Sequence, residues 1–172
     1  AMDQIINSAA KTLYMSGGQL GCPIVFRGPN GAAARVAAQH SQCYASWYAH
    51  CPGLKFVSPW SAADAKGLLK AAIRDDNPCV FLEHKWIYRR IKEIVSDDPD
   101  QLVPIGKADV KREGTDVSVI AHGMMVHLAL EAAETLANEG IQVEVLDLRT
   151  VQPLDVEAIL ATVTKTSRAV VL

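Results

Sequence analysis

The sequence lacks the marks of several large classes of protein. No apolar run approaches the roughly 20 residues that a membrane-spanning helix needs, and no internal repeat is evident. The four cysteines include no C-x-x-C pair, which favours a reduced, intracellular protein over a disulfide scaffold. The phosphate-binding patterns G-x-x-x-x-G-K and G-x-G-x-x-G are absent, as is the G-x-S-x-G of serine hydrolases.

Charge and length restrict the function further. The chain has 17 Lys and Arg against 19 Asp and Glu, spread along its length, so a nucleic-acid-binding function is disfavoured. Its 172 residues suffice for one medium domain or two small ones. The opening AMDQIINSAAK resembles the interior of a helix without a cap, so we expect a fragment of a longer protein.

Hydrophobic periodicity predicts two α/β units with parallel sheets flanked by helices. Helices are expected over residues 2–15, from a Ser61 cap through RDD, from Met124 to Asn138, and from an Asp155 cap to Thr164. The expected strands are PIVFR, LKFVSPW, CVFLEH, DVSVIAHG, IQVEVLDLR and AVVL. Between the units, charges crowd together and Pro99 and Pro104 interrupt, which predicts domains at 1–88 and 115–172 with an irregular linker at 89–114.

The segment AAQHSQCYASWYAHC, residues 37–51, permits two interpretations. His40, Cys43, His50 and Cys51 could bind zinc, but their spacing matches no common zinc module. The spacing of Tyr44, Trp47, Tyr48 and Cys51 is that of a buried helical stripe, with Ser41 as the cap, and this packing interpretation is preferred.

His40 lies between a Gly/Ala-rich loop and an expected helix start. A neutral imidazole there could donate or accept a proton, but a loop histidine is often structural, and the residues alone leave both roles open. The helix end RDDNP, residues 74–78, could hold a hard cation through carbonyls and Asp75 or Asn77, although a solvated turn is the simpler interpretation. His84, His122 and His127 have no companion ligands, and structural roles are expected for them.

Several ordered motifs together resemble the beta subunits of thiamine-diphosphate-dependent 2-oxo acid dehydrogenases, most nearly the pyruvate dehydrogenase branch. The resemblance covers essentially the whole chain. It is carried by MSGGQ, IVFRGPNG, AAQHSQ, HCPGLKFVSPW, DAKGLLKAAIRDDNPCVFLE, PIGKADVKREGTDVSVIAHG and VEVLDLRTVQPLD.

The resemblance implies the C-terminal half of a pyrimidine-binding domain, followed by the start of a transketolase C-terminal-like domain. It also implies an α2β2 heterotetramer that decarboxylates a 2-oxo acid and passes the acyl group to a lipoyl acyltransferase core. Thiamine diphosphate would lie at the α/β interface, with its diphosphate and Mg2+ held by the α subunit. A mitochondrial matrix or bacterial cytoplasmic location follows from the family, with a plastid as a further alternative.

Site residues follow from the same resemblance. His40, in QHSQ, would be catalytic, and a structural K+ would be bound by Ile24, Ala72, Ile73, Asp75 and Asn77. The glutamate that contacts the aminopyrimidine in this family lies upstream of these motifs. No cofactor-binding residue is therefore assigned, and the chain is not expected to activate thiamine diphosphate by itself.

Two departures bear on the substrate. Arg35 stands where relatives often have a small residue, and it could reach a substrate carboxylate or a neighbouring subunit. LEHKWIYRR is more similar to bacterial or branched-chain members than to mitochondrial pyruvate enzymes. A branched-chain 2-oxo acid or acetoin dehydrogenase subunit is therefore the first alternative, and a non-catalytic structural fragment the second.

Overall fold

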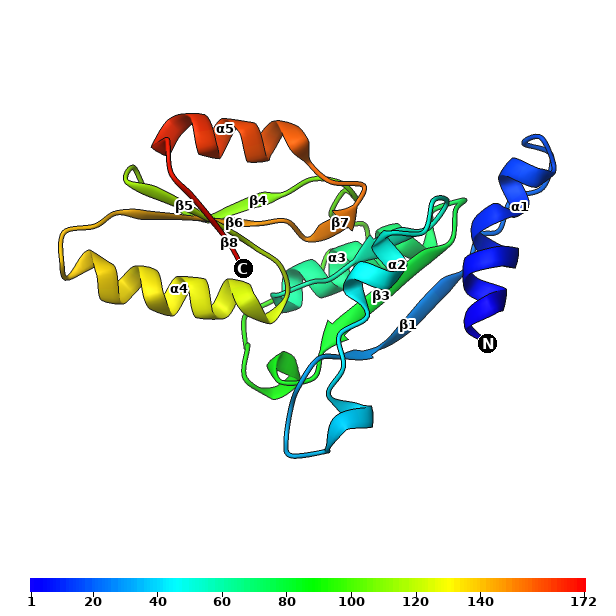
Figure 1. The fold of residues 1–172 in the computed structure, drawn as a ribbon, viewed down its shortest axis with the longest axis horizontal. Coiled ribbons are helices and arrows are strands. Elements are labelled where there is room, and N and C mark those ends of the chain that lie inside the picture. The colour runs from blue at the N-terminus through cyan, green and yellow to red at the C-terminus, as the bar shows by residue number, and fades with distance from the viewer.

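A computed structural model describes residues 1–172 as two four-stranded sheets with helices on their faces (Figure 1). The strand order is β1-β3-β2-β7 in the first sheet and β4-β6-β5-β8 in the second. The first sheet consists of β1 (Val25–Asn30), β3 (Cys79–His84), β2 (Lys55–Val57) and β7 (Thr150–Gln152). The second consists of β4 (Asp109–Arg112), β6 (Val143–Asp147), β5 (Val117–Ala121) and β8 (Ala169–Val171).

Each sheet is parallel except for one edge strand. In the first sheet β1, β3 and β2 run parallel, while β7 pairs antiparallel with β2. In the second sheet β5 pairs parallel with β6 and β8, while β4 pairs antiparallel with β6. The expected parallel sheets flanked by helices are therefore present, and each has one antiparallel edge strand in addition. Because β7 comes from the second half of the sequence, it also joins the two units.

Alternation along the strands determines which helix covers each face of the first sheet. Val57 and Phe81 face α3 (Ala62–Ile73), where they pack with Leu68 and Ala72. Phe56 and Val80 face the other side, towards α2 (Ala45–Ala49) and the N-terminal helix, whose π-helical part (Gln4–Ala9) continues into α1 (Ala10–Met15).

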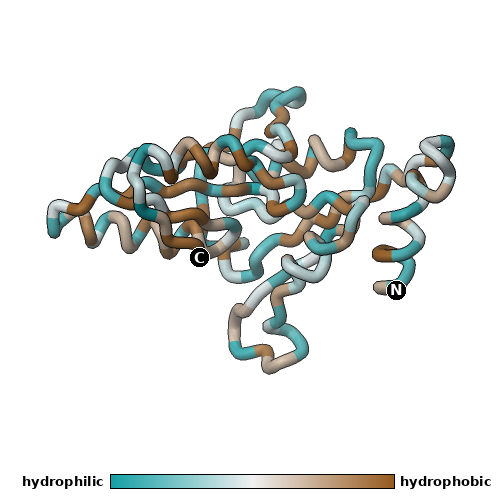
Figure 2. The backbone as a smooth tube through the Cα atoms, turned by 45° about the horizontal axis from the view of Figure 1, so that its top comes forward, coloured by the Kyte–Doolittle hydropathy of each residue, from teal (hydrophilic) through white to brown (hydrophobic).

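The second sheet lies between two helices, α4 (Met124–Ala137) on one face and α5 (Val156–Thr166) on the other (Figure 1). Val143 and Val145 pack with Val126 and Ala129 of α4. The side chain of Leu146, in the same strand, points to the opposite face of the sheet and packs with Ile159 of α5. Figure 2 shows hydrophobic segments gathered in the strands and hydrophilic ones in the connections. None of the helices combines the length and the hydropathy that crossing a membrane requires.

The helix caps expected from the sequence are present. The Ser61 side chain accepts the Asp64 N–H at 3.1 Å, and the Asp155 side chain accepts the Ala158 N–H at 3.2 Å. After the N-terminal helix, Gly17 and Gly18 have φ of 64° and 86°, which the absence of a Cβ permits. These local signals begin and end the helices as they do in isolated peptides.

The region expected as an irregular linker is partly ordered. A 3-10 turn, Ile87–Arg89, ends where this region begins, and β4 at residues 109–112 lies within it and belongs to the second sheet. The charged sequence of β4 is compatible with an edge strand that leaves much of its surface in solvent. Ile73, the last residue of α3, is 66% exposed.

A buried charge cluster lies where the two units meet. The Asp64 carboxylate of α3, 2% exposed, pairs with Lys111 of β4 and with Arg149, which follows β6. The same two cations pair with Asp109. Burial would raise the pKa of Asp64, but Lys111 and Arg149 hold it below its ordinary value. The cluster therefore holds α3 against the second unit by opposite charges.

Candidate functional site

The carboxyl ends of the parallel strands β1, β3 and β2 meet at one edge of the first sheet. Asn30 and His84 end β1 and β3, and Ser58 follows β2. Ligands of open α/β sheets commonly bind outside this edge. The loop of residues 31–44, which contains His40, leaves the sheet here.

Asn30 fixes both ends of this loop. Its side chain, in a residue 6% exposed, accepts the Tyr44 N–H at 3.1 Å and donates to the Cys43 Sγ at 3.1 Å. The Gly31 N–H donates to the Gln42 carbonyl at 2.9 Å. A buried amide with both of its groups satisfied is a stable anchor, so the base of the loop is held while its tip stays in solvent.

Gly31 is required by the close approach of His84. Gly31 has φ of 77°, and a Cβ built on it would overlap the imidazole of His84. The His84 Nδ1 accepts the Trp86 N–H at 3.2 Å, so the ring is held in place from its other side. The glycine therefore permits a contact between β1 and β3 that no other residue would allow.

His40 is the last residue of a 3-10 turn, Ala38–His40, and its side chain is exposed. Its carbonyl accepts a hydrogen bond from the Lys85 Nζ, and its imidazole makes no hydrogen bond or ion pair. The expected position at the start of a helix is wrong. Ser41 bonds back to the Ala37 carbonyl at 2.7 Å, and α2 begins only at Ala45.

The loop contains two non-glycine residues in the left-handed region, Arg35 with φ of 51° and Ala37 with φ of 60°. Such conformations are unfavourable for residues with a Cβ and concentrate at functional sites. Arg35 is exposed, and its side chain makes no hydrogen bond or ion pair within the chain. The backbone of the loop is therefore held in an uncommon shape next to His40.

The expected buried stripe beyond the loop is only partly present. Tyr48 and Cys51 pack against the hydrophobic cluster that contains Phe56 and Val80 of the first sheet. Trp47 is instead 59% exposed, and its ring meets that of Tyr44 edge-on with centroids 5.3 Å apart. The zinc alternative fails, because no group of three or more His, Cys, Asp or Glu side chains could hold a metal ion. Helix α2 is too short to place all four aromatic and cysteine positions on one buried face.

Two histidines expected to be structural meet in one cavity. A space of about 230 Å³ lies between the two units, lined by residues that include Asn30, Ser41, Ser58, His84 and His122. The buried Nδ1 of His122 has no hydrogen-bond partner. Burial lowers the pKa of His122, and burial together with the charge of Lys85 lowers the pKa of His84. Both imidazoles are therefore neutral at neutral pH and able to donate or accept a hydrogen bond.

A sequence signal for this convergence existed. His84 ends β3, and His122 directly follows β5, so each lies at the carboxyl end of a parallel strand. The packing of the two sheets brings His84 and His122 together, and the sequence around each histidine does not determine that packing. His127, by contrast, lies on α4, where its ring packs on Trp86 with centroids 5.1 Å apart.

The residues expected to bind a cation gather where β1 begins and α3 ends. One Asp75 carboxylate oxygen accepts from the Asn77 N–H at 2.9 Å and from its side-chain Nδ2 at 3.0 Å, and the other pairs with Lys55. Burial would raise the pKa of Asp75, but these partners hold it below its ordinary value. The Ala72 carbonyl accepts the Asp75 N–H, and the Ile24 carbonyl accepts the Cys79 N–H. The side chain of Ile73 is apolar and exposed, so only its backbone carbonyl could contact an ion.

Comparisons with known proteins agree with this architecture. Residues 2–90 match the family described as transketolase, pyrimidine binding domain, and residues 106–172 match transketolase, C-terminal domain. The chain is 59% identical over 172 residues to the mitochondrial pyruvate dehydrogenase E1 component subunit beta of Rattus norvegicus, covering 99% of this chain and 48% of that protein. It is 59% identical over 170 residues to the subunit of Rhizobium meliloti, covering 99% of this chain and 37% of that protein.

The Homo sapiens mitochondrial subunit is 56% identical over 172 residues, with 99% of this chain and 48% of that protein covered. The chain thus spans about half the length, or less, of these relatives. Among solved structures, a split gene transketolase described as an inactive beta4 tetramer superposes with a TM-score of 0.81 at 24% identity, over 99% of this chain and 52% of that one. The chain belongs to the transketolase family, with part of a pyrimidine-binding domain followed by part of a transketolase C-terminal domain.

Proposed function

We propose that the chain is a portion of the beta subunit of a thiamine-diphosphate-dependent pyruvate dehydrogenase. In that role it takes part in the oxidative decarboxylation of pyruvate and the transfer of the acyl group to lipoamide, which feeds acetyl-CoA synthesis. The observation that carries the proposal is the 56–59% identity to such subunits over nearly the whole chain. Fold alone would support many functions, so this identity is the stronger ground.

The proposed assembly is an α2β2 heterotetramer that delivers acyl groups to a lipoyl acyltransferase core. Exposed apolar side chains support a subunit contact near the N-terminal helix, where Tyr14 is 86% exposed, Met15 77% and Leu20 63%. Apolar side chains gathered on a surface favour burial against another chain. The active site would then be shared, with this chain forming one wall.

His40 is the proposed catalytic residue. Its imidazole is exposed and has no partner within the chain, while the hydrogen bond from Lys85 to its carbonyl steadies the backbone. A side chain held in this way can meet a reacting group supplied from the other wall of the site. There it would accept or donate a proton, as a histidine does near neutral pH.

Membership of the family implies dependence on thiamine diphosphate, which when bound supplies the carbanion that attacks the 2-oxo group. The residues that line the cavity between the two units fit a neutral ring better than a charged group. Ser41, His84 and His122 offer uncharged donors and acceptors there, and the His122 Nδ1 lacks a partner. The family resemblance implies that the α subunit holds the diphosphate and its Mg2+.

A structural K+ is proposed at Ile24, Ala72, Ile73, Asp75 and Asn77. The proposal is supported by the chemistry of these groups, since the Asp75 carboxylate and the nearby Ala72 carbonyl are oxygen ligands that suit a hard cation. Lys55 already pairs with Asp75, so the ion would share this carboxylate with an ammonium group. The ion would join the start of β1 to the end of α3.

The leading alternative is a branched-chain 2-oxo acid or acetoin dehydrogenase subunit, because LEHKWIYRR resembles bacterial or branched-chain members more than mitochondrial pyruvate enzymes. The proposed compartment is the mitochondrial matrix or the bacterial cytoplasm, since relatives of both kinds are similar. The test is the rate of decarboxylation of pyruvate and of 2-oxoisovalerate by the complete assembly. Preference for pyruvate supports the proposal; preference for 2-oxoisovalerate favours the branched-chain alternative; no turnover of either contradicts both.

A further inference from the structure

A basic groove lies beside the loop that contains His40. It has a volume of about 330 Å³, with Ala33 and Ala34 on one wall. The other wall is formed by Lys85, Trp86, Tyr88, Arg89 and Arg90. This volume is at the lower end of the range for small-molecule sites, which is about 300–1,000 Å³.

The three cations of the groove have no acidic partner. Lys85, Arg89 and Arg90 take part in none of the ion pairs that bind other Lys and Arg residues of the chain. The nearby Glu83 is already engaged by both a 2.7 Å and a 2.9 Å hydrogen bond from Arg27. The groove therefore has a local excess of positive charge in a chain whose net charge is −2.

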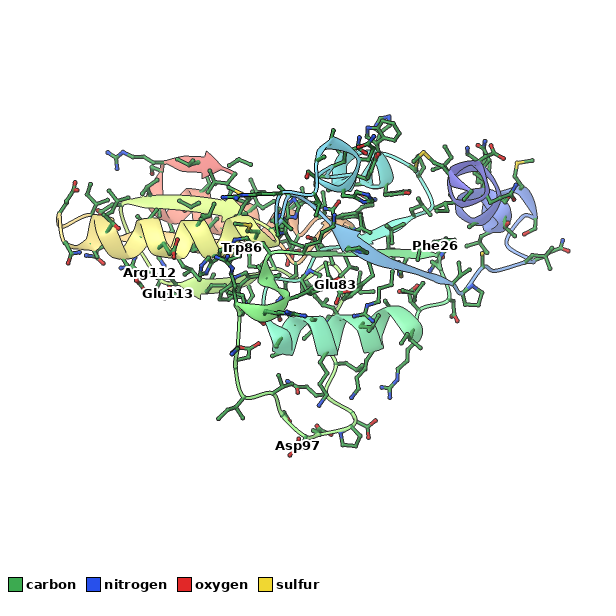
Figure 3. The ribbon with its side chains drawn as sticks, turned by 90° about the horizontal axis from the view of Figure 1, so that it is seen from below. Phe26, Glu83, Trp86, Asp97, Arg112 and Glu113 are labelled. Atoms are coloured by element: carbon green, nitrogen blue, oxygen red, sulfur yellow. The ribbon has the colours of Figure 1, made fainter.

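Aromatic packing holds one of these cations in position. The Arg90 guanidinium lies 4.0 Å from the centroid of the Trp86 ring, and that ring also packs on His127 of α4. Figure 3 shows Trp86 beside α4. A guanidinium stacked on an aromatic face keeps its N–H edge free for a bidentate hydrogen bond to an anion.

We propose that this groove binds a small ligand bearing a phosphate group. A phosphate near neutral pH has close to two negative charges and several acceptor oxygens, which match one ammonium and two guanidinium groups. A single carboxylate would leave part of this charge uncompensated. The inference does not depend on the proposed reaction, since it concerns anion binding by this chain's own residues.

Calorimetric titration with inorganic phosphate tests the proposal, and pyrophosphate and succinate serve as comparison ligands. The wild-type chain is expected to bind phosphate saturably, and Arg90→Ala to weaken binding about tenfold, as loss of a charged hydrogen bond does. Arg90→Lys keeps the charge but loses the planar fork, so it should weaken binding less than Arg90→Ala. Arg89→Ala, at an exposed position, provides a second variant that should fold normally.

Lys92→Ala is the matched control, because Lys92 is basic, exposed and adjacent but does not line the groove. It should change phosphate affinity less than twofold. Equal losses in Lys92→Ala and Arg90→Ala would show a diffuse surface charge and overturn the proposal. Absence of saturable binding, or succinate binding as tightly as phosphate, would also overturn it. Thermal melting confirms that each variant is folded.

Discussion

The Asp64 carboxylate of α3 receives two cations from the second half of the chain, with the Lys111 Nζ and the Arg149 Nη2 each 2.6 Å from one of its oxygens. Removing the carboxylate would leave both cations buried with only the partly exposed Asp109 as partner. We expect Asp64→Asn to lower the free energy of unfolding by about 3 kcal/mol, as breaking a buried ion pair does. Denaturant titration measures this. Asp76→Asn, at an exposed position, is the control and should change stability by less than about 0.5 kcal/mol.

Asp147 should make the stability depend on pH. It is fully buried, its Oδ2 has no partner, and burial raises its pKa to about 7. The folded state therefore holds a proton that the unfolded state loses near pH 4. Its stabilising contribution is complete below about pH 4 and is lost as the pH rises towards 7, by at most about 1.4 kcal/mol per pH unit.

Asp147→Asn keeps the oxygen that accepts the Arg149 N–H but cannot ionise. The stability of this variant, measured by denaturant titration between pH 5 and 8, should fall less steeply with pH than that of the wild type. Parallel pH profiles for the two proteins would contradict the assignment. Asp64 and Asp75 act in the opposite sense, since their lowered pKa values remove stability only at more acidic pH.

Gly31→Ala should destabilise the base of the loop in two separable ways. The positive φ alone costs about 1–2 kcal/mol, and the added Cβ also overlaps His84. Gly17→Ala isolates the first effect, because Gly17 has φ of 64° and nothing within 4 Å of an added Cβ. Combining Gly31→Ala with His84→Ala should restore the part of the stability that the overlap of the added Cβ with His84 removes. A double variant whose loss equals the sum of the two single losses would show that the contact is unimportant.

The local elements were predictable from the sequence because short-range chemistry determines them. Ser61 and Asp155 cap their helices, Gly17 and Gly18 follow the first helix, and the strand at 79–84 begins with a continuous apolar run. Each of these signals acts within a few residues. They establish the two α/β units without reference to distant parts of the chain.

The long-range pairings were not predictable in this way. β7 is only three residues long and forms because β2, nearly a hundred residues earlier, offers an edge. β4 has a charged sequence and becomes a strand through pairing with β6. The meeting of His84 and His122 depends on how the two sheets pack. His40 was identified by family resemblance. In the structure it lies in a 3-10 turn whose backbone is held by Lys85, and not at the start of a helix.

The proposed K+ site predicts a dependence of stability on the monovalent cation. Replacing K+ by Na+ or Li+ should lower the melting temperature of the complete assembly by about 2 °C or more, because the smaller ions fit carbonyl ligands less well. Asp75→Asn should abolish this dependence, whereas Asp76→Asn should preserve it. Identical melting curves of the wild type in all three salts would argue against the site.

We propose that this chain contributes His40 to an active site shared with another subunit. The most direct test is the turnover of the complete assembly containing His40→Ala, measured together with the affinity for thiamine diphosphate. We predict that turnover with pyruvate falls by about 100-fold or more, as loss of general acid–base catalysis does, while cofactor affinity stays within about twofold. Unchanged turnover in a folded, cofactor-bound variant would contradict the claim.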